Sequence, residues 1–380
     1  MTIIVAPDSY KGNMSASEAC AAIKEGILRS DAGAVVHTIP LADGGEGTAR
    51  VITLASGGRF IKASVTGPLG CPVEAEFGLI EKGRVAVLDM ASASGIELIG
   101  RDRLDPMKAS SYGTGELIAA ALNTGAEEII IGIGGSATND GGLGMISALG
   151  FKVLDESGQP VGQGGGALVK IASVDSSGAD KRIKTVSFKA ACDVTNPLLG
   201  PNGASAVFGP QKGATPQMVK LLDEGLSKLA KAWINASLAH DTDQPGDGAA
   251  GGVGAALRIC LAAKMESGAM LTMRRSGFFE LLSKASLIIT GEGRTDGQTA
   301  GGKLCSRVAS EGRKAGIPVA LLSGALDGGI TELLSTFDYA VSIASGETGL
   351  DAMMANGRRN LAFAAENLIR AVRIGRAGSG

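Results

Sequence analysis

Acidic side chains follow many of the β-branched runs that predict buried strands. The carboxylates in such positions are Asp8, Asp43, Glu46, Asp89, Asp140, Asp193, Glu292 and Asp296. Ligands of open α/β sheets bind beyond the carboxyl ends of the strands, so these groups could converge on one crevice. Carboxylates there could hold Mg²⁺ beside phosphate oxygens or accept the proton of an attacking hydroxyl. Each one taken singly is equally compatible with a helix cap or a solvated loop.

Basic side chains share these loops, at Lys11, Lys212, Arg294 and Lys303. The planar fork of an arginine matches the two oxygens of a carboxylate, whereas a lysine suits phosphate as a point charge. Arg294 is therefore the candidate for a substrate carboxylate, and Lys11 the candidate for a phosphate. Simple surface exposure is the alternative for each.

Glycine-rich loops recur at the ends of predicted strands, in segments 42–48, 132–142, 248–254 and 290–296. Glycine lets backbone N–H groups approach phosphate oxygens closely where a strand gives way to a helix. The segment that includes Gly134, Gly135, Ser136 and Thr138 is our candidate for nucleotide phosphates. A tight turn that needs positive φ is the alternative for any single loop.

Two motifs imitate known nucleotide-binding patterns. Gly132-x-Gly134-x-x-Ala137, with Asp155 eighteen residues later, resembles a dinucleotide fingerprint, but Gly141 and Gly142 stand where its helix should begin. We expect that helix to start only near Leu143. Gly297-x4-Gly302-Lys303-Leu304 resembles a P-loop, with leucine replacing the Ser or Thr that holds Mg²⁺.

The elements that position these residues alternate along the chain as in an α/β fold with parallel strands. Strands are predicted at 3–6, 35–40, 85–90, 128–133, 185–191, 286–290, 319–323 and 339–343. Helices are predicted at 15–29, 114–124, 143–149, 216–233, 251–264, 302–315 and 357–374. Ser15 and Glu18 form a capping box for the first helix.

Segment 65–79, rich in Gly, Pro and Val, predicts extended strands or turns that interrupt the alternation. We therefore expect two domains. A Rossmann-like, doubly wound domain of residues 1–62 and 285–380 would carry an inserted α/β domain of residues 63–284, with the active site in the cleft between them.

Composition excludes several function classes. The chain has 380 residues with a net charge of −2, and this balance does not indicate binding to nucleic acid or to an anionic membrane. Its 2 histidines make a zinc cluster or a Ser-His-Asp triad improbable, and its 5 cysteines are widely spaced, as buried free thiols are. No leader or long apolar segment is evident, so we expect a soluble, cytoplasmic protein.

The motifs, in their order along the chain, resemble the type 1 glycerate kinase family. They include Ala6–Lys11, Ala42–Thr48, Gly113–Ile118, Gly132–Gly142, Cys192–Leu198, Phe208–Ala214, Gly248–Leu257 and Ile289–Arg294. The resemblance implies ATP-dependent phosphorylation of D-glycerate, with the 2-hydroxyl favoured and the 3-hydroxyl not excluded. It also implies a two-domain α/β enzyme with one domain inserted in the other.

Chemistry and resemblance together give the expected roles, with ATP and Mg²⁺ as cofactors and D-glycerate as substrate. Catalytic roles are expected for Asp8, Lys11, Asp193 and Glu292, and substrate contacts for Ser9, Lys212, Arg294 and Asp296. Phosphate contacts are expected for Gly134, Gly135, Ser136, Thr138 and Lys303, and metal contacts for Asp43 and Asp193. An NAD-dependent dehydrogenase using Gly132–Ala137 and Asp155, and a non-catalytic binding protein, are the alternatives; the oligomeric state is open.

Overall fold

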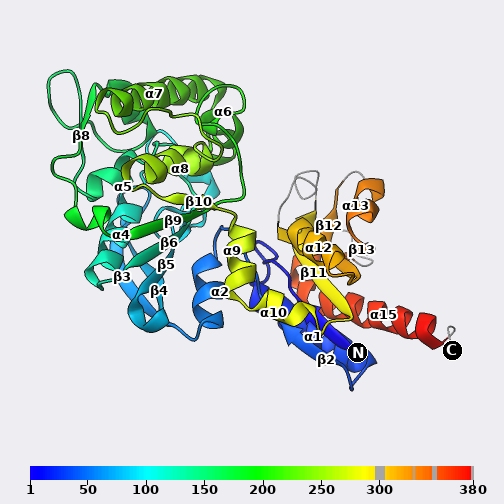
Figure 1. Ribbon diagram of the computed structural model, residues 1–380. Helices are drawn as coiled ribbons and strands as arrows, with labels where there is room; N and C mark the ends of the chain where they lie inside the picture. The colour runs from blue at the N-terminus through cyan, green and yellow to red at the C-terminus, as the bar shows by residue number, and fades with distance from the viewer. Residues whose placement is uncertain (296–303, 328–329, 345–348, 378–380) are drawn as a thin grey trace. The chain divides into compact units, whose positions relative to one another are not determined.

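The computed structural model describes residues 1–295, 304–327, 330–344 and 349–377 (Figure 1). The chain divides into a first unit, Met1–Asp43 with Ala269–Gly380, and a second unit, Gly44–Gly268. These bounds differ from the expected division after residues 62 and 284. The second unit begins earlier because α2 (Thr48–Ala55) packs against β4 (Pro72–Ile80) and β5 (Val85–Asp89).

The sheet of the first unit is wholly parallel. Its strands are β1 (Thr2–Val5), β2 (Val35–Thr38), β11 (Leu287–Thr295), β12 (Val319–Leu326) and β13 (Tyr339–Ser342), in the order β13-β12-β11-β1-β2. Numbered along the unit, this is 2-1-3-4-5, the flavodoxin-like doubly wound order. The strand order reverses between β1 and β11, which makes this the expected binding crevice of the unit.

Helices cover both faces of this sheet (Figure 1). Ile3 and Val5 face a core shared with α1 (Ala16–Ser30) and α15 (Gly357–Ala377). Ile4 and Ala6 point the other way, because side chains alternate along a strand. Their core includes α9 (Gly268–Arg275), α10 (Phe278–Leu282), α12 (Leu304–Lys314) and α13 (Ile330–Thr336). The predicted capping box of α1 is present, with Ser15 N donating to Glu18 at 2.8 Å.

The second unit is built on a mixed sheet in the order β10-β9-β6-β5-β4-β3. β5, β6 (Glu128–Gly132), β9 (Ser187–Ala191) and β10 (Lys264–Glu266) are parallel. β3 (Arg59–Thr66) and β4 form an antiparallel hairpin, where extended strands or turns were predicted for segment 65–79. β7 (Lys152–Leu154) and β8 (Ser173–Asp175) pair separately as an antiparallel ribbon.

The main core of the second unit lies under α4 (Tyr112–Asn123), α5 (Leu143–Ala148), α7 (Pro216–Asn235) and α8 (Ala249–Cys260). On the opposite face α2 packs closely, since a Cβ on Gly78 would lie 1.7 Å from Thr53 Oγ1. The shorter helices are α3 (Ala91–Ser94), α6 (Ala204–Phe208) and, in the first unit, α14 (Leu350–Ala355). The 3-10 helices are 81–83, 96–98, 101–103, 165–170, 181–184 and 210–212.

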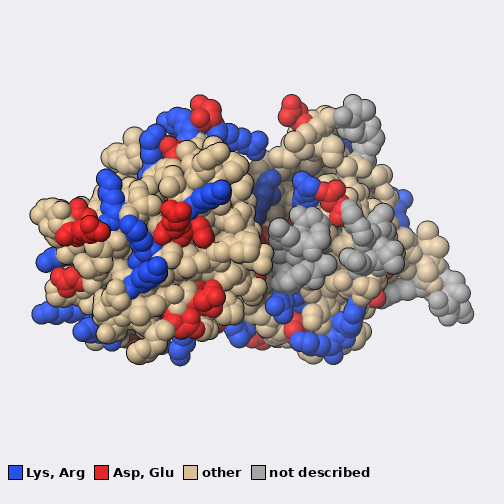
Figure 2. Space-filling view, turned by 90° about the horizontal axis from the view of Figure 1, so that it is seen from above, with Lys and Arg blue, Asp and Glu red and all other residues tan. Residues whose placement is uncertain are grey.

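Among the described residues, no helix is long and apolar enough to cross a membrane. On the face in Figure 2, Lys and Arg side chains are interspersed with Asp and Glu, in keeping with the net charge of −2.

Candidate functional site

Three carboxylates of the first unit, here named the acid cluster, lie near its reversal of strand order. Asp8 directly follows β1, Glu292 belongs to β11, and Asp43 ends the segment that follows β2. The Asp8 amide donates to the carbonyl of Gly291 at 2.8 Å, which fixes Asp8 against β11. Asp8 and Glu292 are each only 8% exposed. Three carboxyl groups thus lie near the crevice that the topology predicts.

Burial, followed by the negative charge of Asp43, raises the pKa of Asp8 from 3.8 to about 8. The Ser9 amide, 2.6 Å from Asp8 Oδ1, and the charge of Lys11 oppose this shift. A carboxyl with a pKa near neutrality suits proton transfer, because it can both take up and release a proton at physiological pH.

The turn after β1 places Ser9 and Lys11. Tyr10 is buried and donates its hydroxyl to the carbonyl of Leu322 at 2.6 Å. Gly291 makes room for it, since a Cβ there would lie 2.3 Å from the Tyr10 hydroxyl. With Tyr10 anchored, Ser9 is left partly exposed and Lys11 exposed, both accessible to a ligand.

The glycine-rich segment that begins at Thr290 is strand rather than loop, which corrects our expectation. β11 continues to Thr295, with Glu292 opposite Ser323 and Arg294 opposite Ala325. The Thr295 hydroxyl lies 2.9 Å from Glu292 Oε1 and 2.8 Å from Ser323 Oγ, which orients the buried carboxylate.

Arg294 is exposed and paired with Asp327, so a substrate carboxylate would compete with Asp327 for the guanidinium. Asp296, Lys303 and the P-loop-like segment 297–303 lie outside the described residues.

Two glycine-rich loops of the second unit meet backbone to backbone. The Gly134 amide donates to the carbonyl of Gly44 at 3.1 Å. A Cβ on Gly134 would lie 2.6 Å from the Cα of Gly45, and one on Gly44 would lie 2.6 Å from the carbonyl oxygen of Ala191. Only glycine fits this approach, at the carboxyl ends of β6 and β9.

Lys212 reaches the same loop from a 3-10 helix far along the chain. It is 2% exposed, and its Nζ donates to Ser136 Oγ at 2.8 Å and to the carbonyl of Thr138 at 2.6 Å. We name Gly134, Gly135, Ser136, Thr138 and Lys212 the loop cluster. The structure thus brings together the predicted substrate lysine and the predicted phosphate loop. Burial lowers the pKa of Lys212 from 10.5 to about 7.

Two of the other carboxylates, Asp89 and Asp140, accept hydrogen bonds from backbone amides. Asp89 accepts from the amides of Gly47 at 2.8 Å and Ala49 at 2.9 Å, which caps the start of α2. Asp140 is fully buried and accepts from the amides of Gly142 and Gly144 at the start of α5. Residues in these positions hold the loops rather than face a ligand directly.

Asp193 follows β9 and accepts a 2.6 Å hydrogen bond from Ser267 Oγ, just after β10. It belongs to the second unit, whereas Asp43, the other predicted metal contact, belongs to the first. Within the described part of the chain, no group of three His, Cys, Asp or Glu could hold a metal. Mg²⁺ nevertheless commonly binds through one or two carboxylates and completes its shell with water and phosphate, so a single carboxylate of either unit fits the chemistry of this ion.

The dinucleotide interpretation is not supported. Its acidic residue, Asp155, lies in an exposed turn, where Oδ1 accepts from the amides of Ser157 at 2.8 Å and Gln159 at 2.9 Å. β7, which precedes it, pairs with antiparallel β8 and lies outside the six-stranded sheet. The helix after Gly132 starts at Leu143, as predicted.

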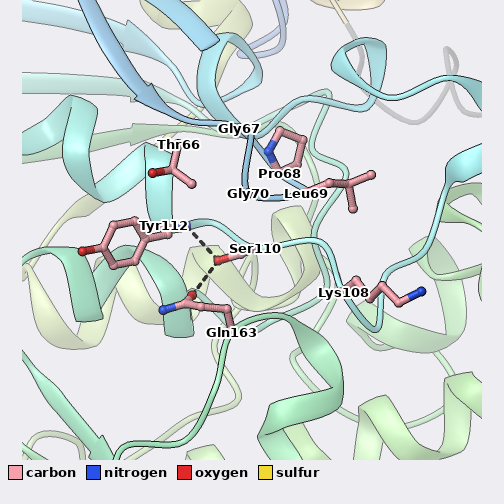
Figure 3. Close-up of a pocket in the computed structure, with 9 residues that line it drawn as sticks. All are labelled: Thr66, Gly67, Pro68, Leu69, Gly70, Lys108, Ser110, Tyr112 and Gln163. Carbon is pink, nitrogen blue, oxygen red and sulfur yellow. Dashed lines mark hydrogen bonds between the residues drawn. The ribbon is translucent and has the colours of Figure 1, made fainter. Parts of the chain in front are cut away.

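A pocket of about 380 Å³ in the second unit was not predicted from the sequence (Figure 3). Its walls are the turn between β3 and β4 and the chain before α4; the lining residues are Thr66, Gly67, Pro68, Leu69, Gly70, Lys108, Ser110, Tyr112 and Gln163. Ser110 Oγ accepts from the Tyr112 amide and donates to Gln163 at 2.7 Å. None of these residues belongs to either cluster.

Comparisons with known proteins agree with both the fold and the motifs. The model of the glycerate kinase family matches residues 3–373. A glycerate kinase of Bacillus subtilis strain 168 is 49% identical, over 86% of this chain and 85% of its own. The glycerate 2-kinase of Escherichia coli K12 is 43% identical over the full length of both chains. A crystal structure assigned as glycerate kinase 2 from Salmonella typhimurium LT2 superposes with a TM-score of 0.85 at 43% identity, over 99% of each chain. The chain therefore belongs to the glycerate kinase family.

Proposed function

We propose that this kinase transfers the γ-phosphoryl group of ATP to the 2-hydroxyl of D-glycerate, with Mg²⁺ as the metal. The hydroxyl oxygen forms the new bond to phosphorus, ADP leaves, and the hydroxyl proton passes to a carboxylate. Family membership over residues 3–373 supports the reaction class, and the glycerate 2-kinase among the relatives supports the position. The observation that carries the residue assignments is the burial of Lys212 against Ser136 and Thr138.

In this proposal the loop cluster holds phosphate. Lys212 supplies positive charge, and Gly134 lets the loop pack on the Gly44 backbone, where its own amide is already hydrogen-bonded. Two of the three N–H groups of Lys212 have partners, which leaves one for a phosphate oxygen. Positioning and charge compensation are the main contributions a protein makes to phosphoryl transfer.

The acid cluster supplies the proton acceptor. Asp8 is our candidate, because it lies buried against β11 at the reversal of strand order, and its raised pKa of about 8 makes its deprotonated form a stronger base than an ordinary carboxylate. Glu292, whose carboxylate is held by the Thr295 hydroxyl, lies near the reaction centre. Ser9, Lys11 and Arg294 contact the substrates. Asp43 and Asp193 would hold Mg²⁺. The bound ion would neutralise the charge that develops on the phosphoryl oxygens. The five free cysteines favour a cytoplasmic location.

The direct test is release of ADP when D-glycerate is added to enzyme and Mg-ATP. Coupling the product to enolase without a phosphoglycerate mutase then distinguishes the two hydroxyls. A signal without mutase supports the 2-position, and a requirement for mutase overturns it. No ADP release with D-glycerate would overturn the proposed reaction.

A further inference from the structure

The ammonium of Lys212 is buried, and both of its hydrogen-bond partners in the described part of the chain are neutral. They are Ser136 Oγ and the carbonyl of Thr138. Burial of an ammonium without a counter-charge favours the neutral amine. A neutral Lys212 would offer a phosphate much weaker attraction. The site therefore depends on whatever keeps this lysine charged.

Asp140 is the charged group whose field acts on Lys212, and it favours the protonated form. It lies on the same loop, two residues after Thr138, and is fully buried. Burial raises its own pKa, and hydrogen bonds from Ser111, Gly144 and Gly142 oppose that shift. These donors favour the anionic form of Asp140 and so act against the effect of burial.

Four donors point at the Asp140 carboxylate. Oδ2 accepts from the Ser111 amide and the Ser111 hydroxyl, both at 2.8 Å, and from the Gly144 amide at 3.2 Å. Oδ1 accepts from the Gly142 amide at 3.1 Å. Ser111 Oγ itself accepts from the Met145 amide at 2.9 Å, so its single proton is directed to Asp140. All four donors favour the anionic carboxylate, in opposition to burial, which is the larger cause and raises the pKa of Asp140.

We propose that Ser111 and Asp140 are positioning residues that keep Lys212 protonated for phosphate binding. This inference rests on the proposed function, in which the loop cluster binds the phosphates of ATP. The sequence marked Asp140 only as one of many loop carboxylates and gave Ser111 no role. In this proposal neither residue contacts the ligand, and both act on it through Lys212.

Binding of ADP in the presence of Mg²⁺, measured by calorimetry between about pH 6 and 9, tests the proposal. We expect wild-type affinity to fall as Lys212 loses its proton. Asp140→Asn should move the midpoint of that fall down by about one pH unit or more, the size of a single opposite-charge effect. Ser111→Ala should move it in the same direction by less. Lys212→Met should bind ADP at least tenfold more weakly, without this pH dependence.

Ser147→Ala is the matched control, because Ser147 lies on α5 and donates to the carbonyl of Leu143 without touching Asp140. It should keep the wild-type midpoint. If Asp140→Asn does not fold, Ser111→Ala still tests the inference. An unchanged midpoint in the folded Asp140 and Ser111 variants, or a retained pH dependence in Lys212→Met, overturns it. Because the readout is ADP binding, a failure to phosphorylate glycerate would count against the proposed function alone.

Discussion

Gly134→Ala should separate the two glycine-rich loops of the second unit. The added Cβ would lie 2.6 Å from the Cα of Gly45 and 3.2 Å from its amide nitrogen. Backbone atoms cannot swing aside as a flexible side chain does, so one loop must shift and stretch the Gly134 to Gly44 hydrogen bond of 3.1 Å. Such overpacking costs about 1–3 kcal/mol, roughly a 5- to 150-fold change in the folding equilibrium.

Gly162→Ala is the control, because a Cβ there meets nothing within 4 Å and its φ is not positive. It should be neutral or stabilise by about 0.4–1 kcal/mol, through reduced freedom of the unfolded chain. Urea denaturation of both variants measures the difference, and ADP affinity should fall only in Gly134→Ala. Equal urea midpoints for the two variants would refute the close approach as the reason for glycine at position 134.

Three further predictions concern the acid cluster and its neighbours. Because the pKa of Asp8 is raised, the folded chain keeps a proton that the unfolded chain loses above pH 3.8. The contribution of this group to the free energy of unfolding is therefore fully present below pH 3.8 and is lost as the pH rises through about 8. The urea midpoint of the wild type, measured in EDTA, should therefore fall between about pH 5 and 9, and it should fall less in Asp8→Asn. An equal fall in both proteins would contradict the raised pKa of Asp8. Activity should vanish in excess EDTA, and Asp43→Asn and Asp193→Asn should each lower kcat ~100-fold; full turnover in EDTA would exclude the metal. Arg294→Ala should raise KM for D-glycerate about tenfold, whereas Asp327→Ala, which releases the guanidinium, should lower it; an unaltered KM in both would remove Arg294 from the site.

The strands and long helices could be predicted because their signals are local. The capping box at Ser15 and Glu18 and the β-branched run at the start of the chain are examples. Gly291 and Gly293 misled the prediction, since they indicate a loop when seen alone. In the structure they are glycine because Tyr10 and Lys11 lie close over β11.

The start of α8, at Ala249, lies within two residues of the prediction, but its backbone conformation was not predicted, for a similar reason. Ala250, Gly251 and Gly252 all have positive φ, and a Cβ on Gly251 would lie 2.2 Å from the carbonyl oxygen of Thr138. The conformation follows from packing against a loop about 110 residues away.

The candidate site was predicted in its residue types but not in its grouping. Ser136 and Lys212 were both selected from glycine-rich contexts, yet their hydrogen bond joins residues 76 positions apart. No periodicity or spacing encodes such a contact. Ser111 was missed because a serine before a helix usually predicts only a cap.

Because one unit is inserted into the other, the two halves of the first unit's sheet are synthesised far apart in time. β1 pairs with β11, so Ile3 must wait for Leu287, and α1 packs on α15 at Gly26 and Ala362. At about 5–20 residues per second, the ribosome takes roughly 15–60 s to supply that partner strand. Meanwhile the continuous segment Gly44–Gly268 has its whole sheet and main core available. The apolar strand Ile3–Val5 would meanwhile have β2 on one side but lack β11 on the other, which makes the first 43 residues dependent on protection from aggregation during synthesis.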